Sequence, residues 1–369
     1  MEKQTRLMSL DTLRGFDMFF ITGGARLIVG LCVGLGAADC WLAKQMAHVP
    51  WEGLAQHDLI FPLFLFLAGV SWPFSLAAQI AKGRTTGQIH RKVLIRAAVL
   101  FLFGLSCGGI LKFDPCFRLS SVLGLIGLAW GIAALVFMHV RRPFLRGGLI
   151  AALLVGYWAL LRFVAAPGAP AGADTYSQAC NIISWLDRTL LPNHIYVRGA
   201  YDPESIFSVV SASTLALIGM CAGAVLRSDR WSGARKAGIL ALGAVGSLAL
   251  DAFFIVILGD AVVKALWSTS FILSAAAYSL ALLALFYWIV DVKGCRRWTL
   301  YFRVIGMNSI TIYMAQMTGV VQPLHKYLFG GLLGWIGLPW GLFAHNLTYC
   351  AVVWAFLYFL YRKGIFLKV

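Results

Sequence analysis

Residues 57–79 read HDLIFPLFLFLAGVSWPFSLAAQ, an apolar run in which Asp58 is the only Asp, Glu, Lys or Arg. A helix needs about 20 mostly apolar residues to cross the hydrocarbon core of a bilayer, so this run predicts a membrane-spanning helix. The segment before it, His48-Val-Pro-Trp51-Glu52-Gly53, places an imidazole, an indole and a carboxylate at the mouth of that helix. Ionisable groups at the edge of a membrane are costly and therefore indicate function.

The rest of the chain has the composition of a polytopic membrane protein. Of its 369 residues, 60% are apolar and 12% are charged, whereas soluble domains have about 25% charged residues. We expect an all-α fold of about ten transmembrane helices in one bundle, and a single domain over residues 1–369. The first span is expected to be an uncleaved helix rather than a signal peptide. The expected spans are 14–36, 57–79, 93–111, 118–138, 145–166, 205–226, 237–258, 266–290, 302–321 and 340–361.

The net charge of +16 sets topology and does not indicate a nucleic-acid partner, because the charges lie in short loops between apolar runs. With the N-terminus inside, 21 Lys and Arg residues fall in inner segments and seven in outer segments. This bias predicts that both termini are cytoplasmic. It also predicts a multi-pass protein of the inner membrane, with the longest loop, 167–204, on the outer side.

His48 and Asp58 are the first candidates for chemistry. A histidine in a short outer loop is usually a solvated surface residue, and a carboxylate at the start of a helix is favoured by the helix dipole alone. The functional interpretation is that Asp58 orients His48 as a general base or nucleophile. The sequence pattern is compatible with both.

Polar residues also mark the first span. In Leu-Asp11-Thr-Leu-Arg14-Gly-Phe-Asp17, the arginine lies three residues from both aspartates, so the three share a helix face. They are either a self-satisfied ion cluster at the inner membrane face or a site that grips an anionic ligand from the cytoplasm. Arg14 suits a phosphate.

Two further motifs have a structural and a functional interpretation. Asp202-Pro203-Glu204 is typical of a helix start, but two outer carboxylates also suit a cationic amino sugar. Asn308-Ser309, inside the ninth expected span, either bonds across helices or donates to a carbonyl oxygen in a reaction centre.

The eight cysteines show no CxxC motif and no Cys/His spacing of a zinc site, so we expect no metal. Cys32 lies in an apolar run and is expected to be a packing residue. Cys40, Cys116 and Cys180 lie in outer loops, where two of them could pair only in an oxidising compartment.

Several of these motifs together resemble the heparan-α-glucosaminide N-acetyltransferase family, in a compact bacterial form without an extra N-terminal luminal part. The matching segments run in order along the chain: RLMSLDTLRGFDM, HVPWEGLAQHDLIFPLFLFLAGVS, SVLGLIG, LDRTLLP, AYDPES, KALWSTSFIL, GMNSITIYM and YRKGIFLKV. The resemblance implies transfer of an acetyl group from cytosolic acetyl-CoA to a glucosamine amine across the membrane.

The resemblance also assigns roles to residues. It implies that His48 is catalytic, with Asp58 in the same motif. The outer-face residues then belong to the acceptor region: Trp51, Glu52, Asp202, Glu204, Lys264 and Trp267. The donor region is expected to include Arg14, Asn308, Ser309 and Thr22, the last of which stands where an animal member has an asparagine.

A second function is compatible with the same features. Ten spans with internal polar residues also suit a membrane transporter for an amino sugar. Against a transporter, the sequence shows no inverted repeat and no matching pair of Gly/Pro-broken helices. The family resemblance further implies a homodimer, and the chemistry implies acetyl-CoA, an amino-sugar acceptor and the lipid bilayer as partners.

Overall fold

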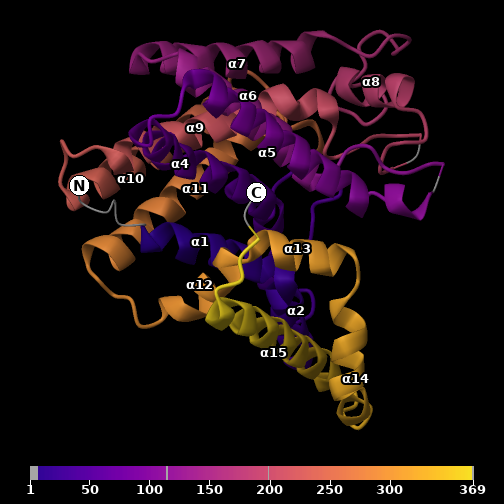
Figure 1. The fold of residues 1–369 in the computed structure, drawn as a ribbon. Helices are drawn as coiled ribbons and strands as arrows, with labels where there is room; N and C mark the ends of the chain where they lie inside the picture. The colour runs from indigo at the N-terminus through magenta and orange to yellow at the C-terminus, as the bar shows by residue number, and fades with distance from the viewer. Residues whose placement is uncertain (1–6, 114, 198, 368–369) are drawn as a thin grey trace. The chain divides into compact units, whose positions relative to one another are not determined.

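The computed structural model describes residues 7–113, 115–197 and 199–367, which form helices and connecting loops without a β-strand (Figure 1). This confirms the all-α prediction. The contacts divide the described residues into two compact units. Unit 1 comprises residues 7–49, 55–60 and 282–367, and unit 2 comprises residues 50–54 and 61–281.

Unit 1 contains the first helices and the last ones. They are α1 (Met8–Phe19), a π-helical turn (Phe20–Gly24), α2 (Ala25–Gly34), α3 (Trp41–Gln45), a 3₁₀ turn (Gln56–Leu59), a second π-helical turn (Tyr287–Val292), α12 (Thr299–Met307), α13 (Ser309–Met317), α14 (Val321–Leu333) and α15 (Trp340–Lys363). The pairs α1 with α12 and α2 with α15 make its most extensive helix contacts.

Glycines let these helices approach closely. A Cβ atom on Gly15 of α1 would clash with the carbonyl oxygen of Phe302 in α12, and one on Gly306 would clash with the carbonyl oxygen of Asp11. The two helices therefore meet backbone to backbone. Close contact between small residues is a common way to pack membrane helices.

Unit 2 contains the helices between. They are α4 (Ile60–Ala81, from residue 61), α5 (Thr86–Cys107), a 3₁₀ turn (Ile110–Lys112), α6 (Val122–His139), α7 (Pro143–Phe163), α8 (Ile182–Leu190), a 3₁₀ turn (Ile206–Ser208), α9 (Val209–Arg227), α10 (Gly233–Val256), a 3₁₀ turn (Lys264–Leu266) and α11 (Thr269–Phe286, to residue 281). Glycines again set the closest contacts, as where Gly219 and Gly223 of α9 meet the backbone of α4.

Eight helices of the described chain are long and apolar enough to cross a membrane, rather than the ten expected. They are Met8–Gly34, Gln56–Ala81, Val122–His139, Pro143–Phe163, Ile206–Arg227, Gly233–Val256, Thr269–Val292 and Trp340–Lys363. The expected span 302–321 is divided at Asn308 into α12 and α13. The expected span 93–111 corresponds to α5, which carries Arg91, Lys92 and Arg96.

The geometry of α5 nevertheless matches that of α6. Gly104, near the end of α5, packs against Ser121 and Gly124 at the start of α6, and Ala97 packs against Gly127 and Gly131 further along. The two helices therefore run antiparallel over several turns. With 22 residues at about 1.5 Å each, α5 is as long as its neighbours.

Candidate functional site

His48 and Asp58 form a direct pair in unit 1. The Nδ1 atom of His48 lies 2.7 Å from Oδ1 of Asp58, and the imidazole is 57% exposed while the carboxylate is 1% exposed. A buried carboxylate is thus in contact with one ring nitrogen of a solvent-accessible imidazole. The His57 ring lies beside it, with ring centroids 4.5 Å apart.

The second carboxylate oxygen of Asp58 fixes the loop that carries His48. Oδ2 accepts hydrogen bonds from the backbone N–H groups of Val49, at 3.3 Å, and Ala55, at 3.2 Å. Because Ala55 precedes the 3₁₀ turn that leads into α4, Asp58 also caps the start of that helix. Asp58 is therefore both a helix-start carboxylate and a contact partner of His48, and its catalytic role stays a prediction.

This arrangement determines which nitrogen of the neutral imidazole is basic. A carboxylate at Nδ1 favours the tautomer with the proton on Nδ1, which leaves the lone pair on Nε2. The same carboxylate stabilises the imidazolium that forms when Nε2 takes up a proton. The pair is therefore equipped for general-base or nucleophilic catalysis.

Trp51 and Glu52 are held against the loops of unit 2. Residue 52 forms an isolated antiparallel bridge with Val263, and Gly53 N–H donates to the carbonyl of Val262 at 2.9 Å. The indole Nε1 of Trp51 donates to the carbonyl of Tyr176 at 2.9 Å. These bonds position Trp51 half-buried on an apolar cluster and leave Glu52 exposed.

The same bridge places Lys264 one residue from the partner of Glu52. Lys264 is half-buried, whereas Trp267 is 1% exposed and packs edge-on against Phe61 and Phe271. Of the predicted acceptor residues, Trp51, Glu52 and Lys264 are accessible to a ligand, and Trp267 supports the loop from below.

Asp202 and Glu204 both form ion pairs with Arg118, which the sequence analysis counted only among the outer charges. Arg118 contacts the carboxylates of both residues, which are 1% and 8% exposed. Burial opposes the charge of Arg118, but its hydrogen bond to Asp202 and the charge of Glu204 raise its pKa above the ordinary value. The three residues form an ion cluster that holds loop 167–204 to the chain before α6.

A fourth member of this region, Asp187 of α8, was also missed as a candidate. Its Oδ1 accepts from the hydroxyl of Ser205 at 2.8 Å, and its Oδ2 accepts from the N–H of Asp202 at 3.4 Å. Burial raises the pKa of Asp187 to about 7. The only sequence signal was its place in the LDRTLLP segment, which periodicity does not distinguish from an ordinary amphipathic helix.

The predicted cluster around Arg14 is present in part. Its guanidinium lies 3.4 Å from Asp11, one turn earlier in α1. Asp17 is 1% exposed, and its Oδ2 has no hydrogen-bond partner among the described residues. A buried carboxylate oxygen without a hydrogen-bond donor inside an apolar helix is a functional candidate in its own right.

The remaining donor-side candidates are buried in unit 1. The Thr22 hydroxyl donates to the carbonyl of Phe19 at 3.2 Å. The amide of Asn308 donates to the carbonyl of Ile365 at 3.2 Å, which ties the break between α12 and α13 to the chain after α15. Ser309 begins α13 and is 6% exposed. These contacts show how the three side chains are packed, and their assignment to the donor stays a prediction.

The candidate residues divide cleanly between the units. The predicted catalytic pair and all predicted donor residues belong to unit 1, whereas all predicted acceptor residues belong to unit 2. Between residues 48 and 61 the chain passes from unit 1 into unit 2 at residues 50–54, returns to unit 1 at residues 55–60, and enters unit 2 again at residue 61.

No family model matches the chain. Heparan-alpha-glucosaminide N-acetyltransferase from Homo sapiens is 26% identical over 427 aligned positions, which cover 99% of this chain and 60% of the human protein. The protein of the same name from Mus musculus is 27% identical over 367 positions, which cover 85% of this chain and 54% of the mouse protein. The chain thus spans little more than half the length of these relatives. Both similarities confirm the resemblance predicted from the motifs.

Proposed function

Because the chain is a relative of the heparan-α-glucosaminide N-acetyltransferases along almost its whole length, we propose that it is a membrane-embedded acetyltransferase. Its donor is acetyl-CoA and its acceptor is the amine of a glucosamine-type sugar. The observation that carries the proposal is the 2.7 Å contact between His48 and the buried carboxylate of Asp58, because amide formation from a thioester needs a group that takes a proton from the amine.

The proposed reaction has two routes through the same atom. As a general base, Nε2 of His48 removes a proton while the sugar amine attacks the thioester carbonyl, and the thiolate of CoA leaves and is protonated. As a nucleophile, Nε2 first takes the acetyl group, releases CoA, and then passes the acetyl group to the amine. Both routes convert acetyl-CoA and an amine into an N-acetyl sugar and free CoA.

The proposal includes a direction. The excess of Lys and Arg in the segments predicted to be cytoplasmic supports a donor that arrives from the cytoplasm and an acceptor on the other side. Acetyl-CoA is polyanionic and does not cross lipid, so its pantetheine arm must reach the acetyl-transfer site through a protein-lined path.

The test is CoA release by the purified protein in detergent, with acetyl-CoA and glucosamine as substrates. Wild type should release CoA in proportion to N-acetylglucosamine formed. His48→Ala should lower the rate by about 10²–10⁴-fold, the range for removal of a general base, and should retain acetyl-CoA binding in a titration.

The matched control is His90→Ala, because His90 lies on α5 outside the candidate site and stacks on His139. It should turn over normally. Uptake of glucosamine into vesicles without any CoA release would instead establish the transporter. Full activity of His48→Ala would contradict the catalytic assignment.

A further inference from the structure

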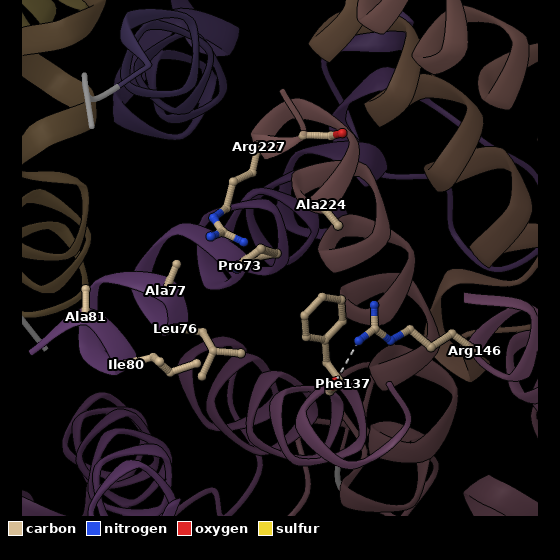
Figure 2. Close-up of a pocket in the computed structure, with 10 residues that line it drawn as sticks. Pro73, Leu76, Ala77, Ile80, Ala81, Phe137, Arg146, Ala224 and Arg227 are labelled. Atoms are coloured by element: carbon tan, nitrogen blue, oxygen red, sulfur yellow. Dashed lines mark hydrogen bonds between the residues drawn. The ribbon is translucent and has the colours of Figure 1, made fainter. Parts of the chain in front are cut away.

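A cavity of about 540 Å³ lies in unit 2, between the ends of four helices. The lining residues come from the end of α4, from α6 and α7, and from the end of α9 and the residue after it: Pro73, Leu76, Ala77, Ile80, Ala81, Phe137, Arg146, Ala224, Arg227 and Ser228. Apart from Ser228, its walls are otherwise aliphatic or aromatic, and its lining contains two arginines and no carboxylate. Figure 2 shows Arg227 on one side, beside Pro73 and Ala77, and Arg146 on the other, beside Phe137.

Arg146 is held rigidly at this cavity. Its Nε donates to the carbonyl of Val140 at 2.6 Å and one Nη donates to the carbonyl of Phe137 at 3.0 Å. Its guanidinium also lies over the Phe137 ring, 3.6 Å from the centroid. These bonds close the C-terminal end of α6, and they use only part of the five-donor guanidinium.

Arg227 is differently placed. It is exposed in the last turn of α9, and its side chain forms no hydrogen bond or ion pair with any residue in the described ranges. A second cation therefore faces the cavity with its donors available. The helix C-terminus explains a basic residue at the end of α9, but it does not explain why two arginines line one apolar cavity.

We propose that this cavity binds the headgroup of an anionic phospholipid, with the phosphate between Arg146 and Arg227 and an acyl chain along Leu76 and Ile80. Charge complementarity supports this ligand, since basic pockets between transmembrane helices on the cytoplasmic side are typical sites for anionic lipid headgroups. The segments that form the cavity are those for which charge bias predicts the inner side. The apolar wall supports it too, because Ile80 is 61% exposed and only 17% of the most apolar stretch of α7 is buried.

The experiment measures the thermal stability of delipidated protein in a neutral detergent. Phosphatidylglycerol, phosphatidylcholine, inorganic phosphate and CoA are titrated separately. Phosphatidylglycerol should raise the melting temperature of wild type in a saturable way, and the other three should not. Arg227→Gln should raise the half-saturating phosphatidylglycerol concentration by about fivefold, as expected for loss of one cation near a lipid phosphate.

Arg230→Gln is the matched control. It removes the same charge three residues away, from a position that does not line the cavity, and should respond to phosphatidylglycerol like wild type. Arg227 is the better test position than Arg146, because its replacement breaks no hydrogen bond in the described structure. If Arg230→Gln weakens phosphatidylglycerol binding as much as Arg227→Gln does, the lipid is attracted to the basic surface as a whole, and the proposed site is overturned. Stabilisation by CoA or inorganic phosphate that Arg227→Gln abolishes would also overturn it, in favour of a soluble phosphate ligand. Neither result depends on acetyl transfer.

Discussion

Asp58 links local folding to chemistry through its two oxygens. One holds Nδ1 of His48, and the other accepts backbone N–H groups from both sides of the loop between them. The loop therefore cannot shift without disturbing the helix start, and the imidazole is held by a group that is itself fixed. Such support of a functional side chain is what a catalytic geometry requires.

The first prediction concerns Asp58→Asn. The asparagine oxygen can still accept the N–H of Ala55, but its amide nitrogen then donates to Nδ1 of His48 and favours the tautomer with the proton on Nε2. The basic lone pair is lost from the reacting nitrogen, so kcat/KM should fall by about 10²–10⁴-fold. Steady-state kinetics on the single variants and on the double variant with His48→Ala will test this. The losses should be far from additive, because the two residues act as a unit. Fully additive losses would contradict the pairing.

The second prediction concerns Asp187. Its pKa is raised by burial to about 7 from an ordinary value of 3.8, so the folded protein binds the carboxyl proton more tightly than the unfolded chain does. The stability gained from the protonated carboxyl is complete below pH 4 and is lost as the pH rises to about 7. Each pH unit in that window costs about 1.4 kcal/mol. In melting curves between pH 4 and 8, Asp187→Asn should flatten this decline. The exposed Asp229→Asn should not, and an unchanged slope in Asp187→Asn would show that the carboxylate is ionised in the fold.

At the scale of elements, the apolar runs predict most helices and their ends to within a few residues, because a span is defined by its length of hydrocarbon-compatible chain. The same criterion fails at α12 and α13. Asn308 lies at the break between them, and its amide donates to the backbone carbonyl of Ile365, a contact that no local pattern contains. The pairing of His48 with Asp58 was predictable as an option only, and Arg118 as the partner of Asp202 was not, since 84 residues separate them.

The third prediction tests the crossing of α1 and α12. Gly15→Ala places a methyl group against the carbonyl of Phe302, so the helices must separate. This should lower the free energy of unfolding by about 1–3 kcal/mol. The melting temperature should fall clearly. Gly331→Ala in α14 is the control, because nothing lies within 4 Å of its Cβ position. A stable Gly15→Ala variant would show that the two helices are further apart than described.

The fourth prediction tests the turn between α2 and α3. Cys32 is buried and free, as expected of a packing residue, and its sulfur lies 3.6 Å from that of Cys40. In a chain with the other cysteines changed to serine, copper–phenanthroline should cross-link the pair with loss of two hydrogens. Mass spectrometry after alkylation detects the bond, and Cys40→Ser is the control in which Cys32 stays alkylatable. Full alkylation of both thiols after oxidation would contradict the contact.

At the scale of the whole molecule, the division of candidate residues follows the division of the fold. Unit 1 contains the predicted catalytic pair with the predicted donor residues Arg14 and Asn308, and unit 2 contains the predicted acceptor residues Trp51, Glu52 and Lys264. This division agrees with the proposal that the donor and the acceptor are bound by different sets of residues. The sequence motif from residue 48 to 62 contributes residues to both units.

The most direct test of transmembrane acetyl transfer uses sealed proteoliposomes with acetyl-CoA enclosed and glucosamine outside. Protein molecules that face the enclosed donor with their basic loops should produce N-acetylglucosamine in the external medium and an equal amount of CoA inside, and His48→Ala should produce neither. Product that forms only when both substrates are on the same side of the membrane, or glucosamine that accumulates inside without CoA release, would contradict transmembrane acetyl transfer.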